Sequence, residues 1–113
     1  MLAFALTTLL LSPWKGADLP TATKSAAKYQ LTIKDAPGAA VHLRATHVAD
    51  GWIAAFCDNR VCSPGELHET MPASGKVVVQ FELIREEDSA ARRSTAVIES
   101  DAGASVKVPV STL

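Results

Sequence analysis

The residues best suited to chemistry gather in one stretch, FCDNRVCSPGELHETM, which runs from Phe56 to Met71. It contains both cysteines, one of the three histidines and one of the two methionines of a 113-residue chain. A blue-copper site uses a cysteine thiolate, two imidazoles and a weak axial ligand that is often a methionine. Cys62, His68 and Met71 supply three of these ligand types within one short run, so a copper site is one interpretation of the stretch.

The second interpretation is a disulfide between Cys57 and Cys62. Asp58 and Asn59, which lie between them, favour a chain reversal because their side chains can hydrogen-bond to their own backbone. Two cysteines at this spacing in an exported protein most simply pair with each other. Such a bridge would consume the thiolate that copper needs. Zinc held by Cys57, Cys62 and His68 is a further alternative, as is a redox-active dithiol, although the CxxxxC spacing differs from the CxxC redox motif.

The remaining histidines and the acidic residues near His68 do not form a convincing catalytic group. His42 alternates with apolar neighbours, which predicts a solvated position on the polar face of a strand, and His47 is expected at a strand end. Glu66 and Glu69 could pair with His68 for acid–base chemistry, but a short charged segment more often protects a sheet edge from aggregation. The sequence has no nucleophile elbow, phosphate loop or zinc-protease motif. We therefore expect no catalytic residue and no enzyme activity.

The elements that must position these residues are predicted to be strands. Apolar and polar residues alternate from Tyr29 to Lys34, which is the pattern of a half-buried strand. Similar segments recur after turn residues such as Pro37-Gly38 and Asp50-Gly51, and no useful helical period lies between them. The seven predicted strands are Tyr29–Lys34, Val41–Thr46, Trp52–Cys57, Glu66–Met71, Lys76–Ile84, Ser94–Glu99 and Ser105–Val110.

About seven short strands with turn signals about every 8–12 residues are typical of an antiparallel β-sandwich, with a barrel as the alternative. We predict an all-β, immunoglobulin-like antiparallel β-sandwich over residues 28–113. Trp52 or Ile53 is expected to anchor its core. Pro109 lacks a backbone donor, so the last strand should lie at a sheet edge or begin a bulge.

The first 12 residues, MLAFALTTLLLS, form the one strongly apolar run. A dozen residues are too few to cross a bilayer, which takes roughly 20, but they match the apolar region of a secretory signal. No basic residue precedes the run and the cleavage site is poorly placed, so a buried strand or helix is the alternative. Residues 13–27 contain two prolines and many small polar residues and are predicted to be a linker. These features predict a secreted or periplasmic protein.

The charge balance restricts the partners. The chain has 11 basic and 12 acidic residues, for a net charge of −1, whereas nucleic-acid binding usually requires a clear basic excess. We expect no nucleic-acid partner, no transmembrane span in the mature chain and no cofactor.

The order of motifs resembles a known group of domains. The Gly51-Trp52 pair opens a strand that ends at Phe56, and a Pro-x-Ser-Gly turn at residues 72–75 precedes a long valine-rich strand and two closing strands. This is similar to immunoglobulin-like and fibronectin-type-III-like accessory domains of bacterial secreted proteins, including glycosidase-associated and cytochrome-oxidase-assembly proteins. The resemblance covers residues 29–110 and implies a spacer, an interaction face or a packing partner. It brings no catalytic residue, and many such domains lack a cysteine pair.

These arguments predict a non-catalytic extracytoplasmic domain with a structural or protein-binding role, and its candidate binding face lies at the Trp52 strand. The alternative is a cupredoxin-like copper-binding or electron-transfer protein that uses Cys62, His68 and Met71. In cupredoxins the ligand loop joins the last two strands, whereas about three predicted strands follow Met71 here. The position of the loop therefore favours the disulfide.

Overall fold

The computed structural model describes residues 7–13, 26–58, 61–86 and 93–111. These residues form two antiparallel sheets and no helix, so none of them belongs to a helix able to cross a membrane. The strands are β1 (Thr8–Pro13), β2 (Ala26–Lys34), β3 (Ala40–Thr46), β4 (Trp52–Asp58), β5 (Val61–Pro64), β6 (Glu66–Thr70), β7 (Lys76–Arg85), β8 (Arg93–Ser100) and β9 (Ser105–Ser111).

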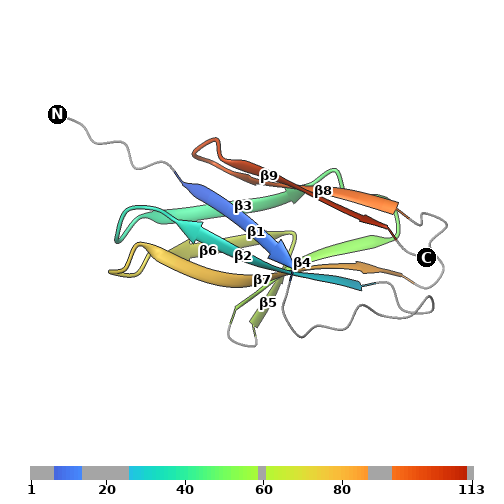
Figure 1. Cartoon of the computed structure of the whole chain (residues 1–113), viewed down its shortest axis with the longest axis horizontal. Helices are drawn as coiled ribbons and strands as arrows, with labels where there is room; N and C mark the ends of the chain where they lie inside the picture. Colours follow the sequence, from blue (N-terminus) through green and yellow to red (C-terminus); the bar gives the residue numbers. More distant parts are fainter. Residues whose placement is uncertain (1–6, 14–25, 59–60, 87–92, 112–113) are drawn as a thin grey trace.

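The two sheets pack face to face as a sandwich (Figure 1). The five-stranded sheet has the order β1-β2-β7-β4-β5, and the four-stranded sheet has the order β6-β3-β8-β9. The all-β antiparallel sandwich is therefore confirmed. All seven predicted strands are present, and the largest shift is at β2, which starts at Ala26 instead of Tyr29. β9, which contains Pro109, is an edge strand as predicted.

β1 lies inside the apolar run that resembles a secretory signal. It pairs with β2 along its whole length, and Leu9 and Leu11 pack against the core. This corresponds to the alternative interpretation of the run as a strand. Cleavage after the run would remove β1 from the sheet. The run is therefore either a strand of the mature chain or a signal that is removed from it. The signal and the linker remain predictions, and residues 14–25 of the linker lie outside the described residues.

The core fills the space between the sheets and takes every second residue of most strands. Phe56 and Phe81 are directly paired across β4 and β7, are fully buried, and have ring centroids 5.0 Å apart at an angle of 52°. Trp52 is the core anchor of β4 at 6 % exposure, whereas Ile53 points outward. Met71, which follows β6, is also buried in the core.

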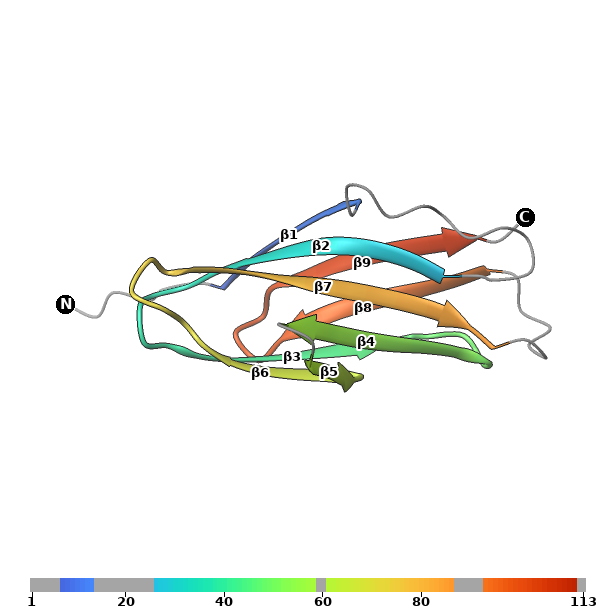
Figure 2. The same ribbon diagram turned by 90° about the horizontal axis from the view of Figure 1, so that it is seen from below.

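β5 and β6 are consecutive parts of one segment that changes sheet at Gly65 (Figure 2). The Gly65 N–H donates to the carbonyl of Ala54 in β4 at 2.9 Å, and the Gly65 carbonyl accepts from the N–H of Ala45 in β3 at 2.9 Å. Its φ of 72° lies in the left-handed region that glycine adopts most readily. This crossing places Cys62 on the outer face of one sheet and His68 on the outer face of the other.

Candidate functional site

The structure does not bring together the three residues of the copper alternative. Cys62 lies on the outer face of the five-stranded sheet, His68 lies on the outer face of the four-stranded sheet, and Met71 is buried between the sheets. The change of sheet at Gly65 causes this separation. A metal ion needs its ligands around one point, so these residues do not form a cupredoxin ligand set.

Cys57 and Cys62 form the predicted disulfide. The two residues lie directly opposite each other in the pairing of β4 with β5, and the neighbouring Asp58–Val61 pair lies nearer the end of the hairpin. No free cysteine occurs among the described residues. The bridge therefore consumes the thiolates that copper or zinc would need.

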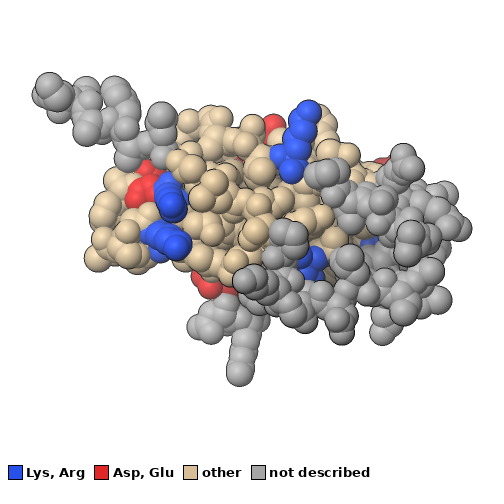
Figure 3. Space-filling model, viewed as in Figure 1, with Lys and Arg blue, Asp and Glu red and all other residues tan. Residues whose placement is uncertain are grey.

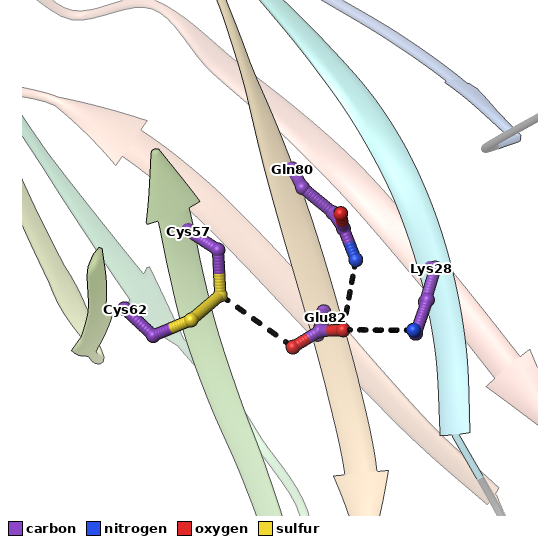
Figure 4. Close-up of a disulfide and its surroundings, with 5 residues drawn as sticks. All are labelled: Lys28, Cys57, Cys62, Gln80 and Glu82. Atoms are coloured by element: carbon purple, nitrogen blue, oxygen red, sulfur yellow. Dashed lines mark hydrogen bonds and ion pairs between the residues drawn. A yellow bond between two sulfur atoms is a disulfide. The ribbon is translucent and has the colours of Figure 1, made fainter. Parts of the chain in front are cut away.

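Polar side chains from β7 and β2 surround the disulfide on the outer face of the sheet (Figure 4). Glu82 places Oε2 3.5 Å from Sγ of Cys57. The bridged sulfur carries no proton, so this is a close contact and not a hydrogen bond. Gln80 Nε2 donates to Glu82 Oε1 at 2.8 Å, and Lys28 Nζ lies 3.5 Å from the same oxygen. This network ties β2, β7 and the disulfide hairpin together.

Replacing both Cys57 and Cys62 by serine should lower the free energy of unfolding by about 2 kcal/mol, because the bridge restricts a small loop in the unfolded chain. Urea unfolding at neutral pH, followed by tryptophan fluorescence, measures the difference from the oxidised wild type. Wild-type protein unfolded in a reducing agent is the matched control and should resemble the variant. Equal stability of the variant and the oxidised wild type would contradict a stabilising bridge.

Large apolar side chains are exposed on the outer face of the five-stranded sheet. Ile53 and Ile84 are direct neighbours on β4 and β7 and are 43 % and 39 % exposed. Leu10 and Val78 are exposed farther along the same face, and Val61 is exposed on β5. On the side of the molecule shown in Figure 3, charged residues are scattered and largely uncharged surface lies between them.

The prediction of a binding face at the Trp52 strand is refined by these positions. The Trp52 side chain itself points into the core, and the apolar surface beside it comes from Ile53 together with Ile84. The sequence did not distinguish Trp52 from Ile53, because the apolar run of β4 provides residues for both faces of the strand.

The outer face of the four-stranded sheet brings two histidines into contact. His42 in β3 is paired with His68 in β6, and their rings stack with centroids 4.2 Å apart and planes within 9° of parallel. One carboxylate oxygen of Glu66 lies 3.8 Å from His42 Nε2, and the other lies 3.9 Å from His68 Nε2. One ligand atom from each of the three residues lies within 4.8 Å of the others, so this group could hold a metal ion.

His42 lies on the polar face of its strand as predicted, but it is not solvated as expected. Its side chain is 25 % exposed, and Nδ1 lies 3.0 Å from Oδ2 of Asp101. A carboxylate only accepts hydrogen bonds, so Nδ1 carries the proton and donates it. Arg44 Nη1 donates to the other carboxylate oxygen at 2.8 Å. The hydrogen bond from His42, together with the charges of His42 and Arg44, lowers the pKa of Asp101.

The remaining acid–base candidates are separated by strand alternation. Glu66 lies near His68, but Glu69 points to the other face of β6, toward Asp58. Burial, a hydrogen bond with Asp58 and the charge of Asp58 raise the pKa of Glu69 to about 7. Glu69 therefore retains its proton to near neutral pH and does not pair with His68. His47 follows the end of β3, as predicted. It is exposed and has a φ of 60°.

Comparison with known proteins identifies the fold and no family. No protein-family model matches the sequence, and no curated protein matches it. The FixG-related protein from Vibrio parahaemolyticus has a similar structure, with a TM-score of 0.56 and 8 % sequence identity over 95 % of this chain and 94 % of that chain. A DUF4466 family protein from Parabacteroides merdae gives a TM-score of 0.47 and 7 % identity over 98 % of this chain and 45 % of that chain. The likeness to the FixG-related protein shows that the chain has a β-sandwich fold of the same kind, and it assigns no activity.

Proposed function

We propose that the chain is a non-catalytic extracytoplasmic β-sandwich domain that binds another protein or a neighbouring domain through the outer face of its five-stranded sheet. The observation that carries this proposal is the adjacent, exposed pair of Ile53 and Ile84. Burial of such apolar surface is the main favourable contribution to protein association. The resemblance to immunoglobulin-like and fibronectin-type-III-like accessory domains of bacterial secreted proteins supports the same role.

The chemistry of the rest of this face favours a protein as the partner. The Lys28–Glu82 ion pair and Gln80 provide polar groups close to the apolar side chains. A mixture of apolar side chains with polar groups that can form hydrogen bonds is typical of protein interfaces. Basic residues do not predominate in this mixture, which disfavours a phosphate backbone as the partner.

Two features support an extracytoplasmic location. The Cys57–Cys62 disulfide is of a kind that persists in oxidising compartments and is rare in the cytosol. The apolar N-terminal run has the composition of a secretory signal.

The surroundings of His42 support a non-catalytic role. Asp101 accepts the Nδ1 proton of His42, as a carboxylate does in a catalytic triad. A triad histidine presents its Nε2 to a hydroxyl or thiol nucleophile, whereas Nε2 of His42 faces the carboxylate of Glu66. Within the described part of the chain, Nε2 of His42 makes no hydrogen bond to a hydroxyl or thiol that it could activate.

Site-specific photo-crosslinking in the native host tests the binding face. A photoreactive amino acid at position 53 or 84 should give a discrete adduct with one partner, identified by mass spectrometry. Thr95, which is exposed on β8 of the other sheet, is the matched control position and should give no such adduct. The absence of an adduct from both Ile53 and Ile84, or the same adduct from Thr95, would contradict the proposal.

A further inference from the structure

We propose that His42, Glu66 and His68 bind one divalent transition-metal ion, such as zinc(II), on the outer face of the four-stranded sheet. This site is separate from the proposed protein-binding face, which lies on the other sheet. It is also separate from the copper set considered above, with which it shares only His68. The sequence suggested copper or zinc only through sets that include Cys62, and it did not point to this group, because His42 and His68 come together only through the pairing of β3 with β6.

His42 is prepared as a ligand by its neighbours. Its Nδ1–H donates to Asp101, so in the neutral imidazole, the form that binds metals, Nε2 carries no proton and its lone pair is available. Metal-binding histidines usually donate their other ring N–H to a carboxylate or carbonyl in this way. Arg44 holds the second oxygen of Asp101 and so fixes the orientation of the carboxylate.

Nε2 of His42 is buried and makes no hydrogen bond within the described part of the chain. Buried polar atoms are normally hydrogen-bonded, so an atom without a partner requires an explanation. The Glu66 carboxylate lies 3.8 Å away, beyond hydrogen-bond distance, and an unprotonated Nε2 cannot donate a hydrogen bond to it. A metal ion between them would satisfy both the nitrogen lone pair and the carboxylate.

The ligand atoms are close enough for one ion once His68 reorients. Zinc–ligand bonds of about 2.0–2.1 Å in a tetrahedral arrangement place ligand atoms about 3.3 Å apart. The Glu66 oxygens lie 3.8 Å and 3.9 Å from the two Nε2 atoms. The His42 and His68 rings are stacked with nearly parallel planes, so His68 must turn out of the stack for both Nε2 lone pairs to point at one ion. The side chains of Glu66 and His68 are 57 % and 72 % exposed, which leaves room for this rotation. His42 stays fixed by Asp101.

The surroundings are open to an ion and favour positive charge. A pocket of about 300 Å³ adjoins both histidines. Arg44 is paired across the sheet with Glu66 on one side and Glu99 on the other and forms an ion pair with Asp101, so acidic groups outnumber basic ones here and the region attracts cations. Two imidazoles select zinc or a similar transition metal over magnesium or calcium, which prefer oxygen ligands. Two histidines and one glutamate leave a fourth tetrahedral position for water or another ligand.

Calorimetric titration of the metal-free, disulfide-intact chain with zinc sulfate tests the site. The wild type should bind one zinc ion per chain, and magnesium sulfate should give no binding. The His68→Asn and Glu66→Gln variants should each bind zinc at least tenfold more weakly. His47→Asn is the matched control, because it removes an exposed imidazole outside the cluster and should bind zinc like the wild type. Circular dichroism checks that each variant keeps the strand content of the wild type.

Two measurements separate a built site from weak surface binding. Asp101→Asn should lower the zinc affinity 10–100-fold, because Asp101 positions His42 without touching the metal. Nitrogen NMR of labelled histidines should show zinc-dependent shifts characteristic of ligation at Nε2 of His42 and His68 and not at their Nδ1 atoms. The proposal is overturned if the wild type shows no saturable binding of one zinc ion. It is also overturned if His47→Asn loses as much affinity as His68→Asn, or if zinc binds through Nδ1 of His42.

Discussion

Replacing Phe81 by alanine should lower the free energy of unfolding by about 3–5 kcal/mol, because truncating a buried aromatic ring loses its packing and leaves a cavity. Phe81 has no solvent exposure and packs against Phe56 in the centre of the core. It lies on β7, which is the middle strand of its sheet and is held by β2 on one side and β4 on the other. Strands paired on both sides cannot move inward easily to fill the space.

Urea unfolding at neutral pH, followed by tryptophan fluorescence, measures this loss. Val78→Ala is the matched control on the same strand, since Val78 points to the outer face and is partly exposed. Its change should stay below about 1 kcal/mol. A loss for Phe81→Ala no larger than that for Val78→Ala would show that Phe81 does not fill the core as described.

Replacing Gly75 by alanine should destabilise the domain by about 2–3 kcal/mol. A Cβ atom at Gly75 would lie 2.8 Å from the backbone oxygen of Asp35, which cannot move without disturbing the chain between the sheets. The φ of 69° adds strain for any residue with a Cβ atom. The shift would also disturb the hydrogen bond in which the Asp35 N–H donates to the Gly75 carbonyl.

Gly38→Ala isolates the contribution of this clash. Gly38 has a similar φ of 80°, but a Cβ atom there meets nothing within 4 Å. Its replacement should cost only the backbone strain, about 1 kcal/mol. The thermal unfolding midpoints of the two variants, compared with the wild type, give the difference. Equal midpoints for Gly75→Ala and Gly38→Ala would rule out the contact with Asp35 as a source of destabilisation.

The alternation of residue types was sufficient to predict most of the sandwich. It located segments such as β2 and β3, whose apolar residues recur at every second position, because a strand with one buried face requires that pattern. Turn residues on either side located the apolar run of β4. β1 was not distinguished from a signal, since its leucines are consecutive and show no alternation. β5 was missed because it has only four residues and contains a proline, so its sequence alone does not indicate a strand. Only its pairing with β4 in the structure identifies it as one.

The candidate sites differ in how far the sequence could reveal them. The disulfide was predictable because Cys57 and Cys62 are close in sequence and separated by turn-forming residues. The cluster of His42 and His68 was not, although alternation placed His42 on a polar face. Alternation predicts which face of the sheet a side chain occupies. It does not predict which strand lies next to its own or in what register the two strands pair. Asp101 comes from the turn after β8 and is 59 residues from His42 in sequence, so no local pattern connects them.

The pairing of β2 with β7 has a consequence for how the chain reaches this structure. The ladder runs from the Ala26–Ile84 pair to the Lys34–Lys76 pair, so it joins segments roughly fifty positions apart in the sequence. Closing a loop of this length costs conformational entropy before any contact between the strands can form. Proteins dominated by such distant pairings fold over milliseconds to seconds, whereas a hairpin forms in microseconds. The β4–β5 hairpin, whose strands are consecutive, can therefore align its two cysteines before the central ladder of its own sheet is complete.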